Sequence, residues 1–276
     1  MRTTSNNPAL TRIPAFSGPN RTVGFGPGPA GGPQTAPPQP AGDPIEQAYF
    51  GPTATSRDTG RMTIEDVTVR TGILLAVLVA TAAFTWFADL GGLAFPAALV
   101  GLGLGLFISL KQSTNPVPII IFAAVEGVFL GGISKYFNDA YDGIVVQAVL
   151  GTMAVAGAKL FMYRSGKIRV TPQFTKMVIG ATIGYAVLLL VNIVVSLFHT
   201  GGLGLFDGGL LSMGIALFAI GLASLNLVLD FDFIQKGAAA GIPERYGWLA
   251  AFGLVVTLIW LYIEILRLLS YLRGDD

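Results

Sequence analysis

The stretch GLVVTLIWLYIEILRLLSYL, residues 253–272, decides the fold of this chain. It is almost wholly apolar, and about 20 such residues are needed for a helix to cross the hydrocarbon core of a membrane. Glu264 interrupts the apolar run well inside its ends. Because an ionised carboxylate is costly in hydrocarbon, Glu264 should face the interior of a helix bundle. The stretch therefore predicts a membrane-spanning helix that also carries a functional group.

The rest of the chain repeats this apolar pattern. Of its 276 residues, 53% are hydrophobic and 12% are charged, whereas about 25% of the residues of a soluble domain are charged. Seven segments are long and apolar enough to span a membrane: 71–88, 93–111, 116–134, 141–163, 175–198, 209–232 and 246–272. The sequence predicts an all-α polytopic membrane protein, with a seven-transmembrane-helix bundle over residues 61–276.

Residues 1–60 have a different composition. The segment FGPGPAGGPQTAPPQPAGDP, residues 25–44, is rich in proline and glycine and has too few aliphatic residues to form a core. We expect a disordered tail over 1–60. It contains no apolar signal-peptide region, so the first span should be retained. Order should begin near Thr63, since Thr63 and Asp66 match a helix capping box.

Composition excludes several classes of function. A net charge of +1 gives no indication of nucleic-acid binding. The chain has no cysteine, which excludes disulfides and thiolate metal sites, and its one histidine, His199, cannot form a histidine-rich site. No pairing of a nucleophile with a base is evident. We therefore expect neither an enzyme nor a resident cofactor, and a bilayer as the first partner.

Lysine and arginine set the expected orientation. Apart from the six arginines up to Arg70, and from Lys159 inside the fourth span, seven lie on the N-terminal side (Lys111, Arg164, Lys167, Arg169, Lys176, Lys236 and Arg245) and three on the other (Lys135, Arg267 and Arg273). The positive side of a membrane protein is cytoplasmic. We expect a multi-pass protein of the cell (inner) membrane, with its N-terminus in the cytoplasm and its C-terminus outside.

Prolines and glycines refine the helix boundaries and contacts. Pro243, followed by Glu244, suits a first helical turn and predicts that the last helix begins at about 243. Gly101, Gly103 and Gly105 should let the second span pack closely on a neighbour.

Three more carboxylates lie in apolar segments. Glu126 lies within IIIFAAVEGVFLGG, residues 119–132, and Asp230 and Asp232 close ALFAIGLASLNLVLDFDFI, residues 216–234. On a helix, Asp230 and Asp232 would diverge by about 200°, so they cannot both face one ion. Either one faces the core and one the interface, or both lie in a solvated loop. Lys236 could pair with Asp232.

The remaining charged residues allow two interpretations each. Glu264 is either a pH-sensing carboxylate or the partner of Arg267 in an i,i+3 ion pair. Glu126 either lines a cation path or packs as a neutral group, with Gly127 permitting a close helix crossing. Arg70 is a candidate counter-ion or an interfacial anchor. Calcium prefers six to eight oxygens, so two or three carboxylates would form a weak, transient site suited to permeation.

Four segments carry a family resemblance: AAVEGVFLG at 123–131, IVVQAVLGTMAVAG at 144–157, LDFDFIQKG at 229–237 and WLYIEILRLLSYLR at 260–273. In their order and spacing, the chain resembles a bacterial member of the Bax inhibitor-1 (transmembrane Bax-inhibitor-motif) family over about residues 65–273. The resemblance implies seven membrane helices and an acidic pair between the last two, which senses pH and gates a calcium leak.

Carried over to this chain, that acidic pair is Asp232, in Phe231-Asp232-Phe233-Ile234, and Glu264, in Leu261-Tyr262-Ile263-Glu264. The same two would form the weak calcium site, with Arg267 or Arg273 as counter-ion. For them to meet, the penultimate helix must continue past Asp232 towards Ala240, or the last helix must project from the membrane.

The expected function is therefore a pH-sensitive calcium leak channel, with calcium or protons as ligands. The alternative is a non-transporting membrane regulator that binds a membrane protease or a stress-response partner. A third interpretation, a proton-coupled carrier, is less favoured because no inverted repeat is visible in the sequence.

Overall fold

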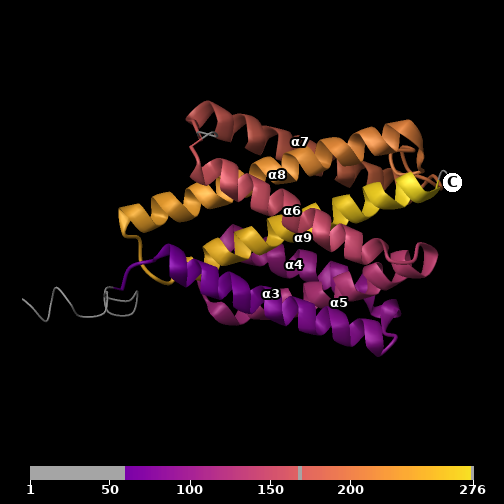
Figure 1. Ribbon diagram of the computed structural model, residues 1–276. Helices are drawn as coiled ribbons and strands as arrows, with labels where there is room; N and C mark the ends of the chain where they lie inside the picture. The colour runs from indigo at the N-terminus through magenta and orange to yellow at the C-terminus, as the bar shows by residue number, and fades with distance from the viewer. Residues whose placement is uncertain (1–59, 167–169, 275–276) are drawn as a thin grey trace, which may run out of the picture. The chain divides into compact units, whose positions relative to one another are not determined.

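A computed structural model describes residues 60–166 and 170–274 (Figure 1). Over these residues, seven helices are long and apolar enough to cross a membrane. They are α3 (Ile64–Phe87), α4 (Ala94–Lys111), α5 (Pro116–Ala140), α6 (Ile144–Arg164), α7 (Pro172–Ser196), α8 (Gly209–Ala240) and α9 (Tyr246–Gly274), with a short 3-10 turn, η2 (Gly91–Leu93), before α4. The predicted all-α membrane bundle is confirmed. The predicted disordered tail, except for Gly60, lies outside the described residues.

The start of α3 follows from its capping residue. Thr63 has an extended backbone, and its hydroxyl accepts a 3.1 Å hydrogen bond from the backbone N–H of Asp66. This bond satisfies one of the free N–H groups of the first turn. The predicted capping of the first helix by Thr63 is thereby confirmed.

The boundary between α8 and α9 corrects two expectations. Helix α8 continues to Ala240, so Asp230 and Asp232 lie inside it and not in a solvated loop. Gly241, with a φ of 63°, then ends the helix in the left-handed conformation that glycine adopts readily. Pro243 does not begin the last helix, because it forms an antiparallel bridge with Arg61, and α9 starts at Tyr246.

Helix α9 is the centre of the bundle. It contacts α3, α5, α6 and α8, while α4 packs on α5 and α7 packs on α8 (Figure 1). Buried side chains cover most of its circumference; Phe252, Leu261, Ile265 and Leu266 are examples. A helix that is apolar on most sides is expected to be buried on most sides. Its polar residues Thr257 and Glu264 are likewise held inside the protein.

Glycines set the close crossings of α5. A Cβ added at Gly131 would lie 2.9 Å from the Cβ of Thr85 and would also collide with the backbone of Ala82, on α3. Gly127 is equally close to α3, which confirms the predicted crossing there. In α4, a Cβ at Gly105 would lie 3.3 Å from the ring of Phe122. Small residues thus bring these helix backbones into contact.

Two glycines of α4 differ in their surroundings. Gly101 faces the carboxyl group of Glu126, so its packing role is confirmed together with that of Gly105. Gly103 has no neighbouring atom within 4 Å and plays no such role.

A short strap ties the start of α3 to the loop between α8 and α9. The N–H of Met62 donates to the carbonyl of Ile242 at 2.8 Å, and the N–H of Glu244 donates to the carbonyl of Gly60 at 3.0 Å. Met62 is fully buried. The strap fixes the loop, and with it the register of α8 against α9.

Candidate functional site

Polar side chains form a stripe along one face of α9. Thr257, Trp260, Glu264 and Arg267 follow one another at spacings of three, four and three residues. Residues three or four apart in a helix lie on the same face. We call these four residues the α9 stripe. Because α9 is the central helix, the stripe is directed at its neighbours and not at lipid.

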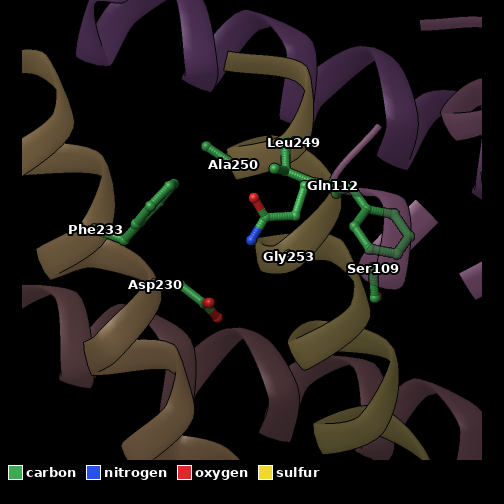
Figure 2. A pocket seen from close by; sticks show the side chains of 8 residues that line it. Ser109, Gln112, Asp230, Phe233, Leu249, Ala250 and Gly253 are labelled. Carbon is green, nitrogen blue, oxygen red and sulfur yellow. The ribbon is translucent and has the colours of Figure 1, made fainter. Parts of the chain in front are cut away.

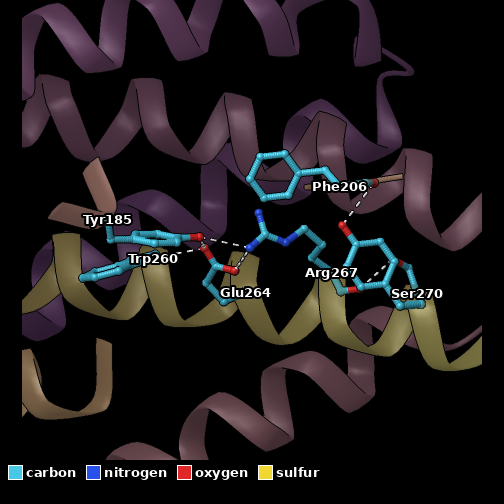
Figure 3. A network of polar contacts seen from close by, with 7 residues as sticks. Tyr185, Phe206, Trp260, Glu264, Arg267 and Ser270 are labelled. Carbon is cyan, nitrogen blue, oxygen red and sulfur yellow. Dashed lines mark hydrogen bonds and ion pairs between the residues drawn. The ribbon is translucent and has the colours of Figure 1, made fainter. Parts of the chain in front are cut away.

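Glu264 is the most enclosed charged group of the stripe, with 3% of its surface exposed. Its carboxyl group accepts a 2.8 Å hydrogen bond from the hydroxyl of Tyr185, on α7, and a 3.2 Å bond from the indole N–H of Trp260. The rings of Tyr185 and Trp260 stack at 5.7 Å between centroids. Figure 3 shows the two rings side by side, with both donor groups directed at the carboxylate.

Arg267 completes this cluster as an ion-pair partner. Its Nη2 binds the second carboxylate oxygen of Glu264 and also lies 3.1 Å from the hydroxyl of Tyr185. The guanidinium lies 4.5 Å above the centroid of the Phe206 ring, in the segment between α7 and α8. The i,i+3 ion pair that the sequence offered as one interpretation is therefore present, and it lies where the bundle meets this segment (Figure 3).

A second polar position lies at the other end of the stripe. Asp230, on α8, accepts a 2.6 Å hydrogen bond from the hydroxyl of Thr257. It lines a cavity of about 280 Å³ together with Ser109, Gln112, Phe233, Leu249, Ala250, Phe252 and Gly253. Figure 2 shows the amide of Gln112 directed across this cavity towards Asp230.

Local structure explains how Gln112 reaches the cavity. Helix α4 ends at Lys111, and Gln112 follows in a left-handed conformation with a φ of 45°. The cavity therefore lies at the end of the bundle where α4 ends and α3 and α9 begin. It offers the side-chain oxygens of Asp230, Gln112 and Ser109, which are the type of ligand that calcium prefers.

The predicted contact between Asp232 and Glu264 is not formed. Helices α8 and α9 form an antiparallel hairpin, and the hydrogen bond between Asp230 and Thr257 sets its register: Asp230 lies 13 residues before Pro243, and Thr257 lies 14 residues after Pro243. Glu264 lies seven residues beyond Thr257, and Asp232 lies two residues on the opposite side of Asp230. At 1.5 Å per residue, the two carboxylates are offset by about 13 Å along the axes. Helix α8 does continue to Ala240, but this does not bring them together.

Asp232 has its own partners instead. Its carboxylate forms a 2.6 Å ion pair with Lys236 and lies 3.4 Å from the hydroxyl of Tyr163, on α6. The pairing with Lys236 that the spacing suggested is thus confirmed. No group of three or more His, Asp or Glu side chains in the described part of the chain could hold a metal ion. Because Asp232 and Glu264 bind different partners, the structure does not bring this pair together, and the weak calcium site expected of it stays a prediction.

Glu126 lies apart from the α9 stripe. Its carboxyl group faces Gly101 of α4, and it makes no hydrogen bond or ion pair with any described residue. On α4, Gly101 is two turns away from Ser109, which lines the Asp230 cavity. The structure therefore does not join Glu126 to the other carboxylates.

The two other candidate counter-ions also bind elsewhere. Arg70 forms ion pairs with Asp66 at 3.0 Å and with Glu244 at 2.5 Å, and it lies 5.2 Å above the ring of Trp248. Arg273 donates a 2.7 Å hydrogen bond to the carbonyl of Asp142, between α5 and α6. Of the three predicted counter-ions, Arg267 alone binds one of the predicted carboxylates among the described residues.

Several residues of the site were not predicted from the sequence, among them Tyr185, Thr257 and Gln112. Thr257 could have been found, since it lies one helical repeat of seven residues before Glu264. Tyr185 gives no such signal, because it lies in another apolar helix and its partner depends on helix packing. Gln112 follows an ordinary helix end, and nothing local indicates that it faces a cavity.

The model of a family described as Bax inhibitor 1 like matches residues 7–274 of the chain. No curated protein sequence matches it. The match covers all seven membrane helices, including Glu264 of the α9 stripe and Asp230 of the cavity.

Proposed function

The chain belongs to the Bax inhibitor 1 like family, and from this we propose that it is a pH-sensitive calcium leak channel of the cell membrane, and not an enzyme. The observation that carries the proposal is the α9 stripe. It leads from the Asp230 cavity at one end of the central helix to the Glu264–Arg267 ion pair near the other. Buried ionisable groups in membrane helices typically mark ion or proton pathways.

The cavity at Asp230 is the proposed cation entrance. Asp230 supplies a negative charge, and Gln112 and Ser109 supply neutral oxygens. So few protein ligands, supplemented by water, would bind calcium weakly and release it quickly, as conduction requires. With the orientation expected from the lysine and arginine count, this entrance faces the cytoplasm.

The Glu264–Arg267 pair is the proposed gate. From Thr257 to Arg267 is ten residues, or about 15 Å of helix, and Glu264 and Arg267 occupy the far part of this length. The guanidinium of Arg267 places a fixed positive charge on the path and is held there by Glu264, Tyr185 and the Phe206 ring. A positive charge in a low-dielectric site repels an approaching cation strongly.

Protonation of Glu264 would release this gate. The neutral carboxyl group can still accept the hydrogen bond of Tyr185, but it no longer attracts the guanidinium. Arg267 lies seven residues from the end of α9 at Gly274, which is about 10 Å. Its long side chain can then extend towards the membrane surface. The proposal therefore expects calcium flux to rise as the pH falls.

The test is calcium flux into liposomes that contain the purified full-length protein and a calcium-sensitive dye, measured across pH. We expect wild-type flux to increase on acidification. Glu264→Gln, which mimics the protonated carboxyl group, should conduct at neutral pH and lose most of the pH response. Asp230→Asn should lower flux at every pH, because it removes the charge of the entrance. Glu65→Gln, an exposed carboxylate at the start of α3, is the matched control.

The same flux assay distinguishes the calcium leak from the alternative function. If folded wild-type protein passes no calcium at any pH, the leak proposal fails. A non-transporting membrane regulator that binds another membrane protein would then be the better interpretation. Flux that does not depend on pH, with Glu264→Gln equal to wild type, would remove Glu264 as the gate while leaving a leak.

A further inference from the structure

A large apolar groove lies on a different part of the molecule. It has a volume of about 750 Å³ and is lined by residues of α3, α5, α6 and α9. Ligand sites typically have about 300–1,000 Å³. The α9 stripe contributes no residue to its lining, so the groove is separate from the proposed ion path.

The groove opens sideways to the membrane. Its rim consists of exposed side chains of two membrane helices, such as Val79 on α3 and Val146 and Met153 on α6. Its floor is made by buried side chains, such as Leu130 on α5 and Ile259 on α9, which is 8% exposed. The groove is thus continuous with the lipid-facing surface of the bundle.

The floor offers no free polar group to water. Its three hydroxyl groups are all bonded within the protein: those of Ser134 and Tyr262 bind each other at 2.7 Å, and that of Thr152 donates to the carbonyl of Ala148 at 2.8 Å. A cavity with an apolar lining stays dry, so water does not fill it. Left empty, its lining atoms would lose their dispersion partners on one side. In the middle of a bilayer, the molecules that can enter are acyl chains.

We propose that the groove between α3 and α6 binds one acyl chain of a membrane phospholipid as a specific, tightly held lipid. Binding gains nothing from the hydrophobic effect, because the chain moves from one apolar medium to another. It gains from packing on three sides, against α3, α6 and the floor formed by α5 and α9.

Polar and aromatic groups at one end of the groove fit the lipid's head. Trp86 and Asn138 line the groove near the ends of α3 and α5. Tryptophan is enriched at the level of lipid headgroups. The side-chain oxygen of Asn138 accepts a bond from the N–H of Gly143, but its NH₂ group donates to no described residue. That NH₂ group can donate to an ester or phosphate oxygen of a phospholipid whose chain occupies the groove.

The test is native mass spectrometry of the full-length protein after extraction into mild detergent. We expect one phospholipid to stay bound per wild-type chain. Val149→Trp fills the groove and should lower the retained fraction about ten-fold, or about 1.4 kcal/mol. The matched control is Val191→Trp on α7, since Val149 and Val191 are 42% and 44% exposed and only Val149 lines the groove. That control should retain the lipid.

Several outcomes would overturn the proposal. One is that the wild-type protein retains no phospholipid. A second is that a free fatty acid or a detergent is the sole bound molecule. A third is that Val149→Trp and Val191→Trp lose the phospholipid to the same extent. If Val149→Trp does not fold, the proposal is tested on the wild-type protein by crosslinking with a phospholipid that carries a photoreactive group in its acyl chain. Crosslinks should form at Ile259 on the floor, which lipid outside the groove cannot contact. Crosslinks confined to outward-facing residues of α3 and α6 would contradict a bound chain.

Discussion

The guanidinium of Arg70, near the start of the first membrane helix, binds Glu244 twice across 174 residues of chain: Nη1 donates to the Glu244 carbonyl at 2.7 Å, and Nη2 to its carboxylate at 2.5 Å. The side chain of Arg70 is almost fully buried. Glu244 belongs to the loop that sets the register of α8 and α9. By holding this loop, the Arg70–Glu244 pair helps to keep Asp230 of α8 opposite Thr257 of α9, although it contacts neither residue.

Arg70→Met should destabilise the bundle. It leaves Asp66 and Glu244 without their shared buried partner, at a cost of about 2 kcal/mol. In thermal unfolding in detergent, this corresponds to a fall of roughly 4–8 °C in Tm. Lys176→Met, at an exposed position of α7, is the control and should leave Tm unchanged. Equal Tm values for the two variants would show that the pair contributes no stability.

The close crossing of α3 and α5 gives a second prediction. Gly131→Ala places a methyl group against the backbone of Ala82 and the side chain of Thr85, so the helices must separate. Such overpacking costs about 1–3 kcal/mol. Gly103→Ala, in open space on α4, should be neutral or slightly stabilising, because alanine favours helix more than glycine. A tolerated Gly131→Ala would mean that the crossing is not tightly packed in the membrane.

Because Asp232 and Glu264 are separated, we expect substitutions at the two positions to have independent effects. Asp232→Asn and Glu264→Gln should each alter stability through different partners, Lys236 and Arg267. Their effects on the free energy of unfolding and on the pH midpoint of flux should add, to within about 0.5 kcal/mol for stability. A double-mutant cycle measures this. Strong non-additivity would reveal a second conformation in which α8 and α9 shift to bring the two carboxylates together.

The sequence predicted the seven helices and their approximate ends, because apolar length and capping residues are local signals. It also offered both short-range ion pairs, Asp232 with Lys236 and Glu264 with Arg267, as one interpretation among others, since these depend only on helical spacing.

Contacts between helices were not predictable in the same way. The pairing of Asp230 with Thr257 depends on the length of the α8–α9 loop, and Pro243 was misplaced because its bridge to Arg61 is a long-range contact. The contact of Tyr185 with Glu264 depends on how α7 packs, and no spacing along the chain encodes that.

Glu126 tests whether a carboxylate outside the α9 stripe matters for flux. It has no ionic partner among the described residues and faces Gly101, so it should behave as a neutral packing group. Glu126→Gln keeps the shape and removes the acid, and should change neither Tm nor calcium flux. A clear fall in flux with unchanged Tm would place the cation path between α4 and α5 and away from Asp230.

The orientation of the bundle gives the last prediction. The excess of lysine and arginine at the end where α3 begins predicts that this end lies in the cytoplasm. Three spans, α7, α8 and α9, separate Gly166 from the C-terminus. Reporter domains fused after Gly166 and after Asp276 should therefore lie on opposite sides of the membrane, the first inside and the second outside. If both report the same side, one of the three helices does not cross the bilayer. If both are reversed, Asp230 faces the exterior, and the proposed leak would take in calcium through the Asp230 cavity and release it past Arg267.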